Sequence, residues 1–320
     1  MDALSDVLQA VRMRGGVFLG ARLSAPWCLA SRLGPDDCRP LLTAPVQLIG
    51  YHYVVAGRML VMLDGEPGSA IEVRAGEAVL LPRNDPHILA SAPGLEPVSA
   101  DDLIQPPRGG GLARIVHGGG GVPAHIACGF LGSDRHSNPL IESLPRLLKV
   151  DMSRSGDWIE SSLRFALRRL AEGEVGTSTV MARLSELMFV EAVRSYAATL
   201  PPGRQGWLAG LRDPSVGRAL GLVHGDVRHP WTAEALAREV AMSRSAFTDR
   251  FTALVGVPPG RYVTRWRLQV AKDKLRDRRR PIAQIAFDVG YDAAAAFNRA
   301  FKREFGLPPA AWRRRSPQAD

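Results

Sequence analysis

The sequence predicts a multidomain α+β protein, in which an N-terminal β-barrel with added helices precedes an all-α C-terminal domain of tandem helix-turn-helix units. Three observations predict this class. Short apolar runs separated by Gly, Pro, Asp and Asn fill residues 17–130, apolar residues return to helical spacing after residue 138, and a long repeat lies near the C-terminus. At 320 residues the chain is also longer than one ordinary domain.

Charge is distributed unevenly along the chain. Residues 211–320 contain 21 Lys and Arg against 11 Asp and Glu, whereas residues 1–210 contain 20 and 21. A basic domain beside a near-neutral one predicts a polyanion partner for the C-terminal part alone, although a cationic solvated surface would give the same count.

Composition argues against several other classes of protein. The 46% hydrophobic and 23% charged residues are typical of a globular protein, and no stretch approaches eighteen consecutive apolar residues. The N-terminus lacks the basic start and apolar run of a signal peptide, and three cysteines are too few for a disulfide framework. We therefore expect a cytoplasmic protein with no membrane partner.

The N-terminal elements follow from apolar spacing. Residues 1–14 predict a short amphipathic helix. The β-rich runs that follow are Val46–Val55, Met59–Leu63, Ala78–Leu81 and Ile126–Leu131. Evenly spaced short strands of this kind are typical of a sandwich or barrel. The glycines and prolines of residues 105–123 predict a loop with one short strand at 112–116.

Three helical faces come next. The first comprises Leu140, Ile141, Leu144, Leu147 and Leu148, and the second comprises Trp158, Leu163, Leu167 and Leu170. The third lies within Val180–Tyr196, where we expect Leu184, Leu187, Met188 and Val190 to be buried. The predicted domains are a β-rich domain at 1–135, a helical coupling or dimerisation segment at 136–200, a linker at 201–212 and a helical domain at 213–315.

An internal repeat with an offset of fifty residues is the most specific feature of the sequence. Residues 251–262 align without a gap to residues 301–312, sharing Phe, four residues, Gly, an aliphatic residue, Pro-Pro, two residues and an aromatic residue. Phe247 and Phe297 match at the same offset. Phenylalanines at i and i+4 anchor one helical face in a core, the glycine supplies a left-handed cap and the prolines stop the helix.

Each copy predicts a helix, a tight turn and a second helix. Ser243 is the expected N-cap of the second helix in the first copy, and Asp292 is the expected N-cap in the second. Ala237 and Ala286 are small residues where paired helices must cross closely. This is the helix-turn-helix plan, whose second helix enters the major groove of DNA. A continuous helix from 259 to about 278 would fix the separation of the two copies.

A dense motif closes the sequence. It runs Ile282-Ala283-x2-Ala286-x2-Val289-Gly290-Tyr291, then Phe297-x3-Phe301-Lys302-x2-Phe305-Gly306-x-Pro308-Pro309. Through this motif, residues from about 215 to 315 resemble the DNA-binding domain of the AraC/XylS transcriptional regulators. The resemblance implies double-stranded DNA as a partner, and RNA polymerase as a second.

The resemblance also implies which side chains face the bases. They are Arg244, Ser245, Thr248 and Asp249 in the first reading helix, and Ala294, Ala295, Asn298 and Arg299 in the second. Plausible phosphate contacts, each of which could equally be a solvated charge, are Arg250, Arg265, Arg267, Lys302 and Arg303. Alanine methyl groups can contact thymine methyls but cannot hydrogen-bond to a base edge. We therefore expect sequence specificity mainly from the first helix.

Three stretches of the β-rich region carry a second resemblance: Tyr51–Gly57, Gly76–His87 and Ala127–Phe130. They resemble the cupin-type barrel that forms the sensor half of many AraC-like regulators, which implies an unknown small-molecule effector. His52 and His87 fall where enzymatic cupins place metal ligands, and Cys128 or His125 could add a third, so zinc is one alternative. The double-histidine strand of those enzymes is absent, and an inert or ligand-filled barrel is the other alternative.

Two further features concern regulation. Cys28 and Cys38 lie ten residues apart in a loop-rich stretch, so a thiol switch between them, or with Cys128, is an alternative to buried, incidental thiols. The helices from about 155 to 200 correspond to the segment that pairs two subunits in the family, which implies a homodimer, although they could simply cover one barrel.

These observations predict a sequence-specific transcription factor, an activator or a repressor, regulated at its N-terminal domain by a small-molecule effector or by thiol oxidation, with no catalytic residues. The main alternative is a cupin metal-dependent enzyme tethered to DNA, which metal analysis would distinguish. A non-specific nucleic-acid binder is the third hypothesis, and equal affinity for random and selected duplexes would identify it.

Overall fold

The computed structural model describes residues 13–34, 36–38, 47–107, 112–133, 139–155, 157–174, 176–201 and 205–315. These residues form two compact units. The first unit takes in the described parts of 12–134 and 144–199, and the second takes in those of 135–143 and 200–320. Of the helix predicted for residues 1–14, residues 1–12 lie outside the described residues. Arg14 is the first residue of a strand. A search of the described helices finds no candidate membrane span.

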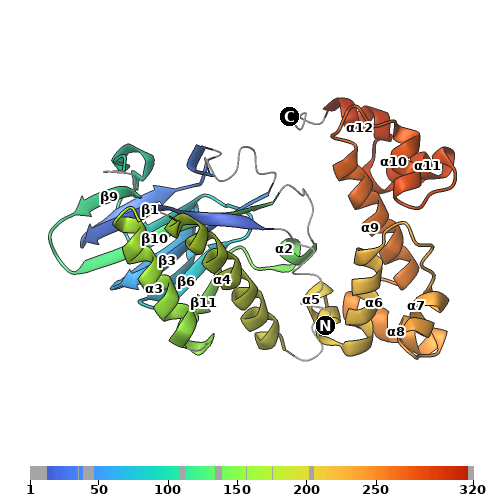
Figure 1. Ribbon diagram of the computed structural model, residues 1–320, viewed down its shortest axis with the longest axis horizontal. Helices are drawn as coiled ribbons and strands as arrows, with labels where there is room; N and C mark the ends of the chain where they lie inside the picture. The colour runs from blue at the N-terminus through green and yellow to red at the C-terminus, as the bar shows by residue number, and fades with distance from the viewer. Residues whose placement is uncertain are drawn as a thin grey trace. The chain divides into compact units, whose positions relative to one another are not determined.

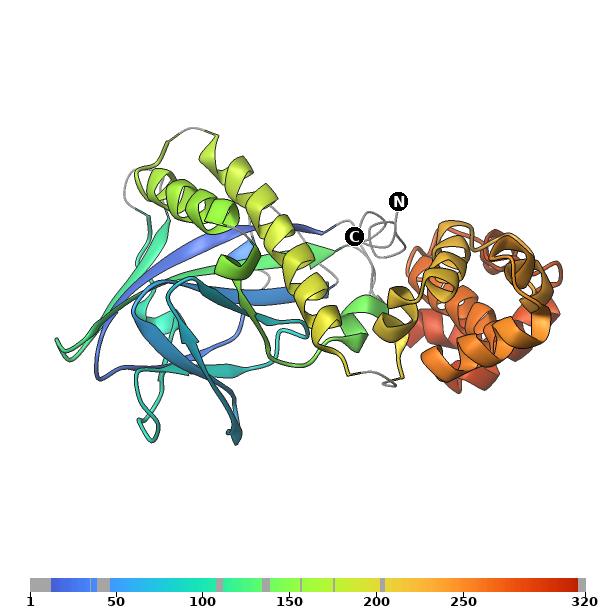
Figure 2. The ribbon, with the colours of Figure 1, turned by 90° about the horizontal axis from the view of Figure 1, so that it is seen from below.

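The first unit contains two β-sheets with an apolar core between them (Figures 1 and 2). Its strands are β1 (Arg14–Ser24), β2 (Cys28–Ser31), β3 (Gln47–Ala56), β4 (Arg58–Leu63), β5 (Glu66–Arg74), β6 (Glu77–Leu81), β7 (His87–Ala90), β8 (Val98–Ser99), β9 (Ala113–Gly118), β10 (Pro123–Ser133) and β11 (Leu148–Asp151). The six-stranded sheet has the order β11-β6-β3-β10-β1-β9, and the five-stranded sheet has the order β5-β4-β7-β2-β8. The predicted barrel architecture is confirmed.

The two faces of strand β3 pack against different parts of the first unit. Val54 belongs to the core between the sheets, whereas the Tyr51 hydroxyl on the opposite face contacts Ser185 of helix α4 (Thr177–Thr199). Helices α3 (Asp157–Ala171) and α4 lie over the outer face of the six-stranded sheet (Figure 2). Because both faces are covered, β3 has a continuous buried stretch in place of an alternating pattern.

The segment between the barrel and α3 differs from the sequence prediction. Helix α2 (Pro139–Ser143) ends before Pro145, and Leu148 begins strand β11, which pairs with β6. The prediction of one helical face from Leu140 to Leu148 was therefore wrong beyond residue 143. Proline disfavours helical geometry at the residue before it and removes a backbone donor, which explains the break.

Helix α2 belongs to the second unit, although the strands on both sides of it in the sequence belong to the first. It packs on helix α5 (Trp207–Arg212), and its Leu140 and Ile141 are fully buried. The chain therefore crosses between the two units before α2, after α2 and again after α4. Residues 207–212, placed in the linker by the sequence, are helical, and Trp207 is buried.

Helices α3 and α4 expose more apolar surface than the spacing predicts. Leu184 and Met188 are buried as expected, but Leu187 is 41% exposed and Val190 is 36% exposed. Trp158, expected on a buried face, is 54% exposed. The apolar spacing did not show that each of these helices has apolar residues on an exposed face as well as on a buried one.

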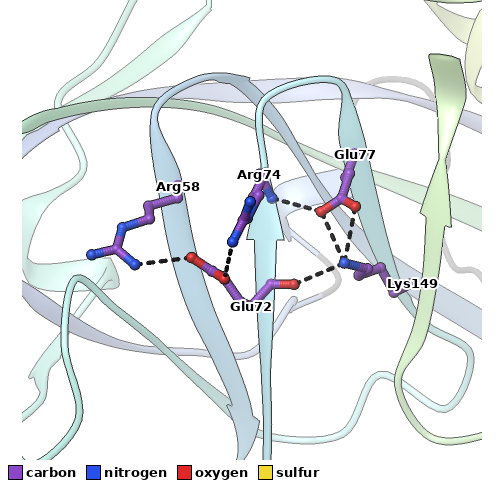
Figure 3. Close-up of polar contacts among 5 residues, drawn as sticks. All are labelled: Arg58, Glu72, Arg74, Glu77 and Lys149. Carbon is purple, nitrogen blue, oxygen red and sulfur yellow. Dashed lines mark hydrogen bonds and ion pairs between the residues drawn. The ribbon is translucent and has the colours of Figure 1, made fainter.

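A chain of ion pairs joins the two sheets at their edge (Figure 3). Glu72 on β5 accepts hydrogen bonds from Arg58 at 2.9 Å and Arg74 at 3.0 Å, which hold the pKa of its carboxyl below the ordinary value. Lys149 on β11 pairs with Glu77 on β6 at 2.9 Å and donates to the carbonyl of Glu72 at 3.1 Å. Since the arginines are largely exposed, these ion pairs contribute little to the stability of the fold.

The second unit is helical. Besides α2 and α5 it contains α6 (Pro214–Gly225), α7 (Ala233–Glu239), α8 (Arg244–Val255), α9 (Pro259–Lys274), α10 (Ile282–Asp288), α11 (Ala294–Phe305) and α12 (Pro309–Arg315). Both predicted helix-turn-helix units are confirmed, as α7–α8 and α10–α11, and α9 joins them. Ser243 caps α8 through its hydroxyl, but Ala293 occupies the N-cap of α11 without a side-chain bond, so the prediction that Asp292 caps this helix was wrong.

Candidate functional site

The two helix-turn-helix units have closely matching cores. The rings of Phe247 and Phe251 lie 5.6 Å apart at 56°, and those of Phe297 and Phe301 lie 5.6 Å apart at 55°. All four are fully buried. The C-cap glycines of the second helices are left-handed in both copies, with φ of 86° at residue 256 and 75° at residue 306. The fifty-residue repeat therefore builds the same local structure twice.

The first reading helix, α8, presents polar side chains to solvent. Arg244, Ser245 and Asp249 are exposed and Thr248 is half-buried, with its hydroxyl donating to the carbonyl of Arg244 at 2.8 Å. The guanidinium of Arg244 has no hydrogen bond or ion pair with any described residue. Arg244, Ser245 and Asp249 are therefore exposed to solvent along the start of the helix.

The second reading helix, α11, presents a less polar face. Ala294 and Ala295 are exposed in its first turn, followed by exposed Asn298 and Arg299. Lys302 and Arg303 are also exposed near its C-terminal end. Among the described residues, none of these four polar side chains has a hydrogen bond or an ion pair. The two reading helices thus differ in the chemistry that they offer at corresponding positions.

Three of the five arginines and lysines predicted to contact phosphate are engaged within the protein. Arg250 donates to Asp213 at 2.7 Å, and Arg265 pairs with Glu304 at 2.9 Å. Burial opposes ionisation of Asp213, yet the bond from Arg250 and two backbone amides hold its pKa below the ordinary value. Since Asp213 also caps α6, the Arg250 pair ties α6 to the first reading helix.

Arg267 has a structural role that its sequence position did not suggest. From α9, its guanidinium donates to the carbonyls of Val227 at 3.1 Å, His229 at 2.7 Å and Gly290 at 3.1 Å. The first two carbonyls precede α7, and the third belongs to the turn before α11. Arg267 therefore connects the two helix-turn-helix units, and three of its five N–H donors are used within the protein.

The barrel interior brings together His52, His87 and Cys128. His52 Nε2 lies 2.7 Å from His87 Nε2, and His52 Nδ1 lies 3.1 Å from Cys128 Sγ. His87 Nδ1 lies 2.9 Å from the carbonyl of Asp85, which can only accept, so this nitrogen carries a proton. For neutral rings the chain then runs in one direction: the Cys128 thiol donates to His52, His52 donates to His87, and His87 donates to Asp85.

Burial keeps these hydrogen-bonded side chains uncharged. Burial and the neighbouring His87 hold the pKa of His52 well below its ordinary value. Burial also lowers the pKa of His87, although its hydrogen bond to Asp85 opposes the shift. The pKa of Cys128 is raised by burial to about 12. Neutral imidazoles and a thiol, all hydrogen-bonded, are the forms that a dry interior favours.

The predicted metal site does not fit this arrangement. His52 points one nitrogen at His87 and the other at Cys128, so the three side chains do not surround one point. Two imidazole nitrogens bound tetrahedrally to zinc at about 2.0–2.1 Å would be roughly 3.3 Å apart, farther than the 2.7 Å between these rings. His125, the other candidate ligand, lies on the opposite face of β10. No group of three possible ligands occurs in the described parts of the chain.

The structure does not bring the predicted redox pair together. Cys28 on β2 belongs to the main barrel core, whereas Cys38 packs with Leu33 and Phe130 in a separate cluster. Both are buried, free thiols. Burial and nearby carboxylates raise the pKa of both, that of Cys38 to about 11. Because the thiolate is the reactive form, neither cysteine has the environment of an oxidant sensor.

Comparison with known proteins places both units. Residues 2–198 match the family described as Cupin, and residues 236–315 match a helix-turn-helix domain family. An AraC-like transcription regulator of Streptomyces antibioticus is 30% identical over 98% of this chain and 99% of its own length. The HTH-type transcriptional regulator AlkR of Acinetobacter baylyi is 27% identical over 99% of this chain and all of its own length. The RCS-specific HTH-type transcriptional activator RclR of Escherichia coli is 26% identical over 99% of both chains.

Proposed function

The chain belongs to the AraC-like transcriptional regulators with a cupin N-terminal domain, and from that membership we propose that it recognises a specific DNA sequence and that an effector bound to the cupin domain controls this recognition. The observation that carries the proposal is the duplicated helix-turn-helix, with exposed polar and basic side chains along both reading helices. Action on transcription through contact with RNA polymerase is the corresponding expectation for the family.

We assign base recognition mainly to the first reading helix. Arg244, Ser245, Thr248 and Asp249 offer donors and acceptors to base edges in the major groove, and an arginine can bind guanine through two hydrogen bonds. In the second helix Ala294 and Ala295 offer only methyl groups, which leaves polar readout to Asn298 and Arg299. Lys302 and Arg303, which have no protein partner among the described residues, are assigned to phosphates.

For control of the cupin domain we favour a small-molecule effector over thiol oxidation. All three cysteines are buried and have raised pKa values, so little thiolate is available to an oxidant. An effector acts without that requirement, by binding one conformation of the domain better than another.

A homodimer is the assembly that we propose. Val180, Leu187 and Val190 form an exposed apolar stripe on α4, and Trp158 and Phe165 do the same on α3. Exposed apolar surface of this extent, on two helices that pack together, is typical of an interaction site. A second copy of the same face would cover it and bring two pairs of reading helices to one DNA.

The experiment that tests the proposed function selects DNA from a random duplex library with the full-length chain, then titrates selected and scrambled duplexes at several salt concentrations. We expect the selected sequence to bind roughly a thousandfold or more tightly, the usual margin for a specific regulator. Equal affinity for both duplexes at every salt concentration would refute sequence-specific recognition.

A further inference from the structure

A groove of about 550 Å³ lies against the outer face of the six-stranded sheet. Its floor includes Gly20 of β1, Val55 of β3 and Ala127 of β10, and Leu167 of α3 contributes a wall. The cavity inside the barrel, which His52 lines, measures only about 20 Å³, room for roughly one water molecule. Of these two spaces, which the described residues line, only the groove outside the barrel has room for a small organic molecule.

Gly20 leaves the floor of this groove open. A Cβ built on Gly20 meets no atom within 4 Å, whereas one on Gly129 of the adjacent strand would lie 2.2 Å from the ring of Tyr51. Residue 129 therefore has to be glycine because the ring of Tyr51 lies directly over it. No neighbouring atom in the structure excludes a side chain at residue 20. Glycine weakens a strand interior and often marks a place where another molecule approaches the backbone. The open space above Gly20 is a second sign of a binding surface.

The two charged side chains that line the groove, Arg22 and Arg114, are both positive, and the lining contains no Asp or Glu. His125 beside them is neutral, because burial and the nearby Arg22 lower its pKa. Arg22 and His125 are register partners on β1 and β10, and Arg114 pairs with residue 20, two positions before Arg22. Arg22 has no hydrogen bond or ion pair with any described residue, and the Nε of Arg114 donates to the side chain of Gln105 at 2.9 Å. Positive groups gathered without a counter-charge favour an anion between them.

A second large hollow in this unit shows the contrast. It measures about 530 Å³ and is lined by Arg58, Glu72 and Arg74, whose charges pair with one another (Figure 3). The arginines there already have a carboxylate. Of these two hollows, the groove beside Gly20 is the one that combines an apolar floor with guanidinium groups that have no acidic partner in its lining.

We propose that the groove beside Gly20 binds an amphipathic organic anion. Its acid group would lie among Arg22, Arg114 and His125, where guanidinium groups can bind a carboxylate through paired hydrogen bonds. Its apolar body would cover Gly20 and Ala127 and contact Leu167. Such a ligand matches the groove in charge, in volume and in the division between polar rim and apolar floor.

The regulatory meaning of this site rests on the proposed function. Leu167 belongs to α3, the helix whose opposite face carries exposed Phe165 and Trp158. A ligand wedged between the sheet and α3 would bias the position of that helix, and with it the apolar face that we assign to the dimer. The groove is thus the candidate site of the effector.

Calorimetric titration of the full-length chain with three probes that share an unbranched eight-carbon chain tests the binding. Octanoate should bind, whereas octanol and octyltrimethylammonium should bind at least tenfold more weakly. Of the three probes, only octanoate has a negative charge that can pair with the arginines of the groove. Arg22→Gln should weaken octanoate roughly tenfold, in keeping with one lost charge-assisted hydrogen bond. Gly20→Val should abolish binding by filling the floor. The matched controls are Arg58→Gln in the other hollow and Gly68→Val on β5, whose Cβ also meets open space.

Equal binding of octanoate and octanol, or octanoate binding that survives Gly20→Val in a protein of unchanged melting temperature, would overturn the proposal. The outcome is separable from that of the proposed function. Loss of sequence-specific DNA binding with intact octanoate binding would refute only the regulator, and the reverse would refute only the groove. If both hold, octanoate should change affinity for the selected duplex in the wild-type chain and not in Gly20→Val.

Discussion

The guanidinium of Arg267 donates to the carbonyl of Gly290 at 3.1 Å, and a Cβ at residue 290 would lie 2.7 Å from the same guanidinium. Gly290 also has a left-handed φ of 83°, which a side chain disfavours. One residue therefore has to be glycine for two reasons, backbone geometry and the closeness of an arginine that connects both helix-turn-helix units.

Replacing Gly290 by alanine should destabilise the second unit. We expect a loss of about 2 kcal/mol in the free energy of unfolding, the usual scale for strain at such a backbone position. Urea denaturation followed by circular dichroism measures it. The matched control is Gly260→Ala in α9, where an added Cβ meets nothing and alanine should be neutral or stabilising. Equal effects of the two substitutions would contradict the strain argument.

Arg244 and Lys302 should affect DNA binding in different ways. Arg244→Ala is expected to cost about 1–3 kcal/mol on the selected duplex and much less on a scrambled one, because it reads a base. Lys302→Ala should weaken both duplexes alike and lower the slope of log affinity against log salt by about 1, because it neutralises a phosphate. Fluorescence anisotropy across a salt series distinguishes them, with Arg183→Ala of α4 as control. Identical profiles for the two variants would overturn their assigned roles.

The thiol of Cys128 should matter as a hydrogen-bond donor and not as a nucleophile. Cys128→Ser keeps a donor to His52 and should retain most of the stability, whereas Cys128→Ala leaves a buried ring nitrogen without a partner and should cost about 1–3 kcal/mol. Thermal unfolding of the first unit measures both. If Cys128→Ala were more stable than Cys128→Ser, the proposed chain of hydrogen bonds from Cys128 to Asp85 would be contradicted.

Acidification should destabilise both units before carboxylates titrate. Burial depresses the pKa of His52 and His87 in the first unit. In the second unit burial lowers the pKa of His224, whose Nε2 lies 2.6 Å from the Tyr262 hydroxyl, to about 3. Their stabilising contribution is complete above the unfolded value near 6.5 and is lost as the pH falls below it. Each group adds a slope of up to about 1.4 kcal/mol per pH unit. Urea titrations between pH 7 and 5 should show this loss in both transitions, and a flat profile in that window would contradict it.

The exposed apolar face of α3 and α4 should hold two subunits together. Phe165→Asp, at a residue 52% exposed, should convert the protein to a monomer that remains folded. Light scattering after size-exclusion chromatography measures the mass, and Val122→Asp, at a site 71% exposed on a turn, is the control. A wild-type chain that is monomeric at micromolar concentration would refute the dimer.

The sequence predicted most where local chemistry repeats. The phenylalanine pairs, Gly256 and Gly306, and the cap at Ser243 each follow from rules that act over a few residues, and the structure has them where expected. The prediction of Asp292 as an N-cap was wrong because helix α11 begins one residue later than expected. Its N-cap is Ala293, which makes no side-chain hydrogen bond. Local rules place an element well and its first residue less well.

Tertiary neighbours decided what the sequence could not. Arg267 is indistinguishable in sequence from a phosphate-binding arginine, and only the fold places three carbonyls around it. His52 and Cys128 were correctly grouped, but the geometry of a metal site depends on which ring nitrogen faces which neighbour. The groove beside Arg22 combines residues from β1, β9, β10 and α3, and the alternation of β1 alone gives no sign of it.

Helix α2 has a consequence for how such a protein can be recombined. Because α2 belongs to the second unit while β10 and β11 belong to the first, no single cut in the gene separates the two halves cleanly. A hybrid that joins this cupin domain to a foreign DNA-binding domain at residue 200 would carry a helix whose buried Leu140 and Ile141 had lost their native surface. Exchange of halves between relatives would therefore succeed only where α2 and α5 are inherited together.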